Sequence, residues 1–135
     1  MIVFDSSFVV AYHNTRDVHH AAARDAMHRV IAGEWGSVLL PEYVFLEVTT
    51  VLAARRDLRT AVAVGELLLE AREVEFVSCS EFFQPAFEVF RGQTNSDLSF
   101  TDAAIVAIAR ARGVEHVATF DTDFGDVDGL TVVPD

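Results

Sequence analysis

Short apolar runs alternate with longer segments of helical spacing along the whole chain. The runs predict short strands at residues 2–4, 35–40, 75–79, 116–120 and 130–133. The segments between them predict helices over residues 6–12, 17–31, 41–55, 58–72, 80–91 and 99–113. This alternation is typical of an α/β fold, because each helix returns the chain so that the next strand can pair in parallel. We therefore predict a parallel sheet of four to five strands flanked by helices.

Local signals set the ends of several of these segments. Ser6 and Ser7 are suited to cap a helix that follows the first strand, and Gly33 is suited to end the second helix. Pro41 opens a helix at its first turn, where its missing N–H costs nothing. Pro134 closes the last short strand.

The length of 135 residues suits one domain over residues 1–135 with one core, and 51% hydrophobic residues can fill it. No uncharged apolar stretch approaches the roughly 20 residues that span a bilayer. Asp5 interrupts the first apolar run, so we expect no signal peptide. The single cysteine, Cys79, excludes an internal disulfide and fits a reducing compartment. We expect a cytoplasmic protein.

The formal net charge is −11, and all ten basic residues are arginine. The missing lysine excludes receiver domains and aspartyl-nucleophile phosphatases, which both use one. The chain also lacks the glycine-rich dinucleotide fingerprint, the P-loop and the H-E-x-x-H zinc motif. The acidity itself has two readings, a metal site with a basic partner or a general bias of the surface.

Four acidic residues stand where apolar runs meet turns or helices, namely Asp5, Glu47, Asp102 and Asp121. Parallel sheets bind ligands at the carboxyl ends of their strands. Asp5 follows the first strand and Asp121 the fourth, so both should emerge at that edge. Asp102 lies in the first turn of its helix, and Glu47 lies about two turns into the helix after the second strand. We expect the four carboxylates to converge in one cleft.

Convergence of four carboxylates is unfavourable unless a cation joins them, since like charges raise one another's pKa. A hard divalent ion such as Mg²⁺ or Mn²⁺ keeps them ionised and can generate a nucleophilic hydroxide for phosphodiester hydrolysis. Each residue also has an ordinary reading. Asp5 and Asp102 are suited to cap helices, Asp121 with Asp123 to form a turn, and Glu47 to face solvent.

The chain resembles the PIN-domain ribonucleases, and within them the VapC-type toxins of toxin–antitoxin pairs. The resemblance covers essentially the whole chain. It rests on motifs in a characteristic order: Asp5-Ser6-Ser7 after the first strand, Glu47 in the helix after Pro41-Glu42, Leu98-Ser99-Phe100-Thr101-Asp102-Ala103, and Thr119-Phe120-Asp121-Thr122-Asp123-Phe124.

The resemblance implies a metal-dependent endoribonuclease. With Mg²⁺ or Mn²⁺ and water as the nucleophile, we expect cleavage to leave a 5′-phosphate and a 3′-hydroxyl. Its catalytic and metal-binding residues would be Asp5, Glu47, Asp102 and Asp121. Asp123 would either assist or only shape the turn, and Ser7 and Thr101 would orient carboxylates or water as second-shell groups. Members of this family commonly dimerise and are inhibited by a cognate antitoxin that inserts a segment into the site.

A net charge of −11 is unfavourable for binding RNA, because phosphates are normally bound by lysine and arginine. The phosphate contacts that the chain offers are Arg16, Arg55, Arg56, Arg59 and Arg91. The alternative function is a PIN-like RNA-binding or assembly module without nuclease activity.

Overall fold

Five strands form one sheet in the computed structural model, which describes residues 1–135. The strands are β1 (Ile2–Phe4), β2 (Val38–Pro41), β3 (Val74–Val77), β4 (His116–Ala118) and β5 (Thr131–Val133). Their order is β3-β2-β1-β4-β5, and every neighbouring pair is parallel. From β1 the chain first adds β2 and β3 on one side of it and then β4 and β5 on the other. The strand order therefore reverses between β1 and β4.

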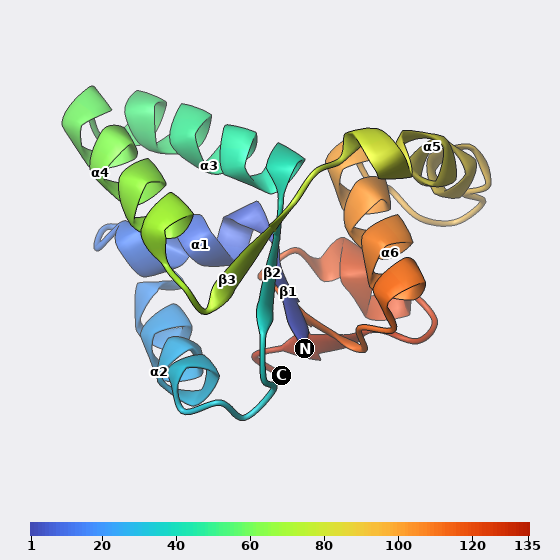
Figure 1. Ribbon diagram of the computed structural model, residues 1–135, viewed down its shortest axis with the longest axis horizontal. Coiled ribbons are helices and arrows are strands. Elements are labelled where there is room, and N and C mark those ends of the chain that lie inside the picture. Colours follow the sequence, from blue (N-terminus) through green and yellow to red (C-terminus); the bar gives the residue numbers. More distant parts are fainter.

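Six α-helices cover the sheet in two groups (Figure 1). The first group is α1 (Ser6–His13), α2 (His20–Ile31), α3 (Glu42–Arg55) and α4 (Leu58–Glu70). The second group, on the other side of the sheet, is α5 (Phe83–Arg91) and α6 (Phe100–Arg112). Two short 3₁₀ segments, η1 (Ser80–Phe82) and η2 (Thr122–Asp126), precede α5 and follow β4. The sheet is thus the middle layer of three.

The core is centred on β1 and α6, which contribute its most deeply buried segments. All three residues of β1 are buried, as expected for a central parallel strand with helices on both faces. In α6 every residue from Asp102 to Ala109 is buried. Asp5, directly after β1, and Asp102, in the first turn of α6, are therefore buried although they carry carboxylates.

The predicted α/β architecture with its parallel sheet is confirmed, but several boundaries differ. The second helix begins at His20 rather than at residue 17, because the Asp17 side chain accepts a hydrogen bond from the His19 N–H and forms a turn instead. Trp35 lies in the turn before β2. Pro41 is the last residue of β2 and the N-cap of α3, not its first helical residue.

The fourth strand also ends earlier than predicted, at Ala118. The N–H of Phe120 donates to the Ser7 hydroxyl oxygen at 3.0 Å. This hydrogen bond replaces a strand–strand bond and turns the chain toward α1. None of the helices combines the length and the apolar character that crossing a bilayer requires.

Candidate metal centre

Three carboxylates meet at the carboxyl end of the sheet, from Asp5, Asp102 and Asp121. One oxygen of each lies within 4.8 Å of the others. Asp5 follows β1 and Asp121 follows β4, and these strands are neighbours, so both side chains emerge at the point where strand order reverses. Asp102 reaches the same point from the first turn of α6. Asp5 and Asp102 are buried and Asp121 is half-buried.

Asp5 is the most firmly held of the three. Its carboxylate accepts hydrogen bonds from the Ser6 N–H at 2.8 Å, the Ser7 hydroxyl at 2.9 Å and the Thr119 hydroxyl at 2.6 Å. Burial raises the pKa of Asp5 above its usual value, while the three hydrogen bonds act in the opposite direction. The carboxylate is consequently fixed in position but electrostatically unfavourable without a counter-charge.

The hydroxyl of Thr119 joins Asp5 to Asp121. It donates to Asp5 and accepts the Asp121 N–H at 2.9 Å, and its side chain is buried. The Ser7 hydroxyl lies 3.1 Å from it and also contacts Asp5. Sequence reasoning singled out Ser7 but missed Thr119. The sequence did contain a signal for Thr119, since it is a hydroxyl residue two positions before Asp121 at the end of a predicted strand.

Asp102 is both a helix cap and a member of the cluster. Its N–H donates to the Ser99 hydroxyl at 3.1 Å, and its carboxylate accepts the Ser99 N–H at 3.0 Å, which completes a capping box. Burial, together with the charges of Asp5 and Asp121, raises the pKa of Asp102 to about 6. The capping interpretation and the metal-site interpretation therefore apply to the same side chain.

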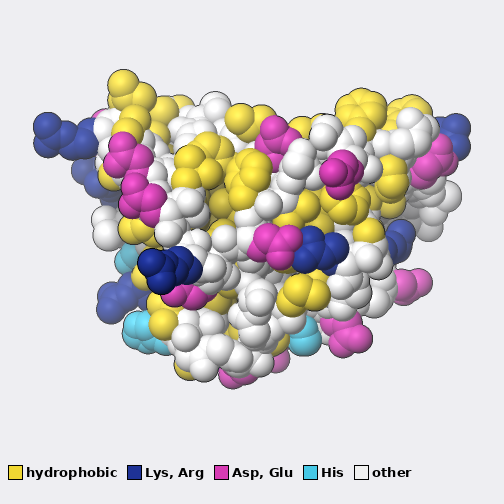
Figure 2. Space-filling model, in the orientation of Figure 1, with side chains coloured by type: hydrophobic (Ala, Val, Ile, Leu, Met, Phe, Trp, Pro, Cys, Tyr) yellow, Lys and Arg dark blue, Asp and Glu magenta, His cyan; other side chains and the backbone are white.

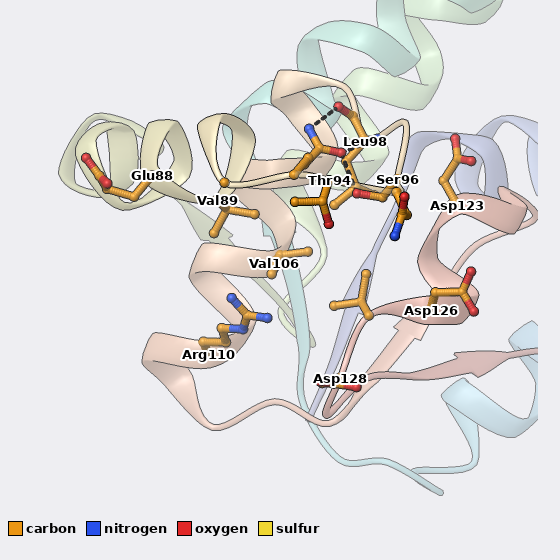
Figure 3. Close-up of a pocket in the computed structure, with 14 residues that line it drawn as sticks. Glu88, Val89, Thr94, Ser96, Leu98, Val106, Arg110, Asp123, Asp126 and Asp128 are labelled. Carbon is orange, nitrogen blue, oxygen red and sulfur yellow. Dashed lines mark hydrogen bonds between the residues drawn. The ribbon is translucent and has the colours of Figure 1, made fainter.

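Asp123 lies beside the cluster without being one of its three members. Its N–H donates to the Asp121 carboxylate at 2.9 Å in an Asx-type turn, and the Asp121 charge raises the pKa of Asp123. Asp123 also lines a cavity of about 510 Å³ between α6, η2 and the loop after α5 (Figure 3). In that view Arg110 lies on one side of the cavity and Asp123 and Asp126 lie on the other.

Glu47 stands apart from the three converging carboxylates. Its side chain is exposed on α3, and its Oε1 accepts a hydrogen bond from the Ser6 hydroxyl. The Ser6 N–H in turn donates to Asp5, so one residue links Glu47 to the cluster. The sequence predicted that four carboxylates would meet. The structure brings three of them together, and Ser6 lies between the fourth, Glu47, and the cluster. Thr101 is half-buried and makes no hydrogen bond to these carboxylates.

The donor set fits a hard divalent cation. All of its ligand atoms are carboxylate oxygens, with no histidine or cysteine among them. Mg²⁺ and Mn²⁺ prefer oxygen ligands, whereas zinc sites usually include nitrogen or sulfur. Asp5 and Asp102 both have raised pKa values that a nearby cation would reverse.

Comparison with known proteins identifies the family of this chain. The family model described as PIN domain matches residues 2–130. The 23S rRNA-specific endonuclease VapC20 of Mycobacterium tuberculosis (strain ATCC 25618 / H37Rv) is 30% identical over 136 residues, which cover all of both chains. The crystal structure of M. tuberculosis VapC20, described as a sarcin–ricin loop cleaving toxin, superposes with a TM-score of 0.81 at 28% identity. That match covers 93% of each chain.

A more distant structure shares the fold alone. The toxin–antitoxin complex from Klebsiella pneumoniae matches with a TM-score of 0.67 at 18% identity, over 97% of this chain and 96% of the other. The full-length match to VapC20 and the family match extend over the strands and helices that carry the acidic residues. The chain therefore belongs to the PIN-domain family and, within it, to the VapC-type proteins.

Proposed function

We propose that this protein is a metal-dependent endoribonuclease and the toxin of a toxin–antitoxin pair. One observation carries the proposal: Asp5, Asp102 and Asp121 converge within 4.8 Å at the switch point of the sheet. A relative of the same length, 30% identical throughout, is named a 23S rRNA-specific endonuclease. The reaction would be hydrolysis of an RNA phosphodiester bond by water, leaving a 5′-phosphate and a 3′-hydroxyl.

In this proposal Asp5, Asp102 and Asp121 hold Mg²⁺ or Mn²⁺, with Asp123 as an additional ligand. When bound, the ion supplies Lewis acidity toward the phosphate and a lowered pKa for water in the site. Thr119 and Ser7 hold the Asp5 carboxylate in one orientation, so that little rearrangement is needed on binding. Thr101 remains a proposed second-shell residue on the α6 side.

Glu47 has a different proposed role, because it is exposed and lies outside the group of three. Its Oε1 is occupied by the Ser6 hydroxyl, and its Oε2 has no partner in the protein. We assign Oε2 to orient the attacking water and to take up its proton. That assignment makes Glu47 a catalytic residue on the solvent side of the metal centre.

The arginines that remain for RNA lie mainly at one end of the molecule. Arg29, Arg91 and Arg112 form ion pairs with glutamates, so we propose the unpaired arginines as the main phosphate contacts. Arg55 ends α3, and Arg56 reaches the Asn14 side chain at 3.4 Å. Figure 2 shows dark-blue side chains at the left edge, where α3 and α4 meet.

This arginine-rich end is made of Arg16, Arg55, Arg56 and Arg59. Glu47 and Arg55 lie on the same helix and are separated by about 12 Å of helical rise. An RNA backbone that leaves the metal centre along α3 would meet these guanidinium groups. They supply the positive charge that the chain as a whole lacks.

Protein partners in this proposal are a second copy of the chain and a cognate antitoxin. Phe83, Phe87 and Phe90 of α5 are 53%, 40% and 41% exposed, and Figure 2 shows the apolar surface over α5 at the upper right. We assign this face to a homodimer. We propose that the antitoxin inserts a segment into the acidic site formed by Asp5, Asp102 and Asp121. An RNA substrate and the buried free thiol of Cys79 fit a cytoplasmic location.

The decisive experiment incubates purified protein with RNA and Mg²⁺ or Mn²⁺, with and without a chelator. Asp5→Asn should abolish cleavage, and Asp25→Asn, an exposed aspartate on α2, serves as the matched control. Cleavage that survives both the chelator and Asp5→Asn would contradict the proposal. Products with 2′,3′-cyclic phosphate ends would instead indicate attack by the ribose hydroxyl.

The alternative function is RNA binding or assembly without cleavage. Its support is the strongly acidic surface, since a net charge of −11 with no lysine is unusual for a protein that processes RNA. Metal binding in calorimetry separates the two functions. Absence of both metal binding and cleavage would favour the binding module.

A further inference from the structure

A column of aromatic rings runs from the core to the surface beside the metal centre. The rings of Phe8 and Phe120 stack with centroids 6.1 Å apart and an interplanar angle of 23°. The ring of His19 stacks on Phe120 at 4.4 Å, nearly parallel at 5°. Phe8 is fully buried, Phe120 is half-buried and His19 is exposed. The column therefore ends in an imidazole ring that faces solvent.

The column is tied to the metal centre through the backbone. Phe120 stands between Thr119 and Asp121 in the chain, and its N–H is fixed by the Ser7 hydroxyl. The segment that positions two groups of the acidic site thus also positions the Phe120 ring. The column is thus joined to the acidic site through the residue that directly precedes Asp121.

His19 is held in place by its backbone and by the stacking of its ring on Phe120. Its N–H donates to the Asp17 carboxylate at 2.8 Å, and its carbonyl accepts the Ala23 N–H at 2.9 Å. The ring nitrogens make no hydrogen bond within the protein. The next residue back, Val18, is 89% exposed, the highest value among the large apolar side chains. This turn presents apolar and aromatic surface that the fold itself does not use.

We propose that a nucleobase of the RNA substrate stacks on the exposed face of His19, as the outermost layer of this column. The inference rests on the proposed nuclease function and assigns a base-binding position within it. Single-stranded RNA is commonly held by bases stacked on aromatic or histidine rings, and such stacking tolerates many sequences. It also needs little positive charge, which suits a chain with net charge −11 and no lysine.

The test measures binding of a short single-stranded RNA that carries 2-aminopurine, whose fluorescence is quenched when the base stacks. Binding is measured in an Asp5→Asn background, so that the RNA stays intact. We expect His19→Ala to raise Kd about tenfold and to relieve the quenching. His19→Phe should retain both the affinity and the quenching, because it keeps a flat ring. His28→Ala, an exposed histidine on α2 without an aromatic contact, is the matched control.

Equal affinity of His19→Ala and the parent protein would overturn the inference, as would loss of binding in His19→Phe with retention in His19→Lys. The second pattern would show a charge contact with phosphate instead of stacking. The proposed function is judged separately, from cleavage by the wild-type protein. If the wild-type protein cleaves RNA and His19→Ala binds as well as its parent, only the stacking inference fails. If the wild-type protein neither binds nor cleaves RNA, both fail.

Discussion

Asp5 and Glu47 belong to the same proposed acidic set, yet the fold holds them in opposite ways. Asp5 is 3% exposed, follows the central strand and accepts three hydrogen bonds from neighbouring residues. Glu47 is exposed on a helix and accepts one, from Ser6. The first carboxylate is buried at the sheet edge and held by three hydrogen bonds, and the second is an exposed side chain linked to it through Ser6.

This difference separates two tasks that the sequence pattern merged. A metal ligand benefits from a fixed position, because an unbound ligand that must reorganise loses affinity. A group that takes a proton from water must lie within hydrogen-bond reach of that water. The contrast between Asp5 and Glu47 therefore predicts different losses when either is changed.

The largest effect is expected at Asp5. Asp5→Asn should reduce kcat/KM for RNA cleavage by about 10³-fold or more, because it removes a fixed negative ligand worth several kcal/mol in the transition state. Glu47→Gln should cost less, about 10²-fold, the lower end of what a general base contributes, and should leave metal affinity nearly unchanged. Kinetics and calorimetric metal titration of both variants measure the difference. Equal losses of metal affinity in Asp5→Asn and Glu47→Gln would contradict the assignment of Asp5 as a metal ligand and Glu47 as a proton acceptor.

Thr119→Val is expected to rank next. It removes the hydroxyl that donates to Asp5 and accepts the Asp121 N–H, while keeping a similar shape. Metal affinity should fall about 10–100-fold, and the free energy of unfolding should fall by about 1 kcal/mol because the partly buried Asp121 N–H loses its acceptor.

Thr119→Ser should restore most of the metal affinity, since it returns the hydroxyl. Thr131→Val, at an exposed position on β5, is the control for the loss of a strand threonine. Metal titration and thermal melting of these three variants test the role of Thr119. A metal affinity in Thr119→Val equal to that of wild type would show that the hydroxyl only supports the fold.

Asp102→Asn is expected to stabilise the metal-free protein. The pKa of Asp102 is about 6 in the fold against an ordinary value of 3.8, so the folded protein binds this proton more tightly than the unfolded chain does. Stability is consequently lost as pH rises from about 4 to 6, and the full cost persists above pH 6. Asparagine keeps an oxygen for the Ser99 N–H and removes the charge.

The variant should therefore unfold about 3–6 °C higher than wild type at pH 7, which corresponds to about 1–2 kcal/mol. The gap should close as pH approaches 4. Added Mg²⁺ should raise the melting temperature of the wild type and not of the variant. Asp126→Asn is an exposed control. A gap that is constant from pH 4 to 7 would rule out relief of this carboxylate's charge as the cause.

The smallest effect is expected from Ser6→Ala, which cuts the link between Glu47 and the cluster. Water can replace the lost hydroxyl at an exposed carboxylate, so stability should change by less than about 1 kcal/mol. Cleavage should fall only a few-fold. Ser7→Ala is the comparison, because Ser7 contacts Asp5 and the Phe120 N–H, and its loss should be clearly larger. A reversed order of the two serines would contradict the contrast between the fixed and the exposed side of the site.

The sequence was sufficient for the architecture and for the residues that follow the strands. Asp5 and Asp121 could be placed together because apolar runs mark strand ends, and parallel strands end at a common edge. The sequence did not predict the element boundaries where a side-chain hydrogen bond makes a helix or strand shorter than its hydrophobic pattern indicates. The start of α2 shifted because Asp17 forms a turn with His19, and β4 shortened because the Phe120 N–H pairs with Ser7.

The site shows the same division. Thr119 reads as an ordinary strand residue, and only the contact between β1 and β4 reveals that its hydroxyl serves Asp5. The separation of Glu47 from the three aspartates was also hidden. It depends on how α3 packs beside α1, which no periodicity within α3 specifies.

The pairing of β1 with β4 has a consequence for biosynthesis. Thr119 and Asp5 meet across 114 positions of the chain, and Asp121 lies beyond Thr119. In a nascent chain, Asp5 has no Thr119 hydroxyl to pair with until 114 further residues have been added. In the proposed ribonuclease, this topology keeps the acidic site unassembled until β4 and Asp121 have left the ribosome.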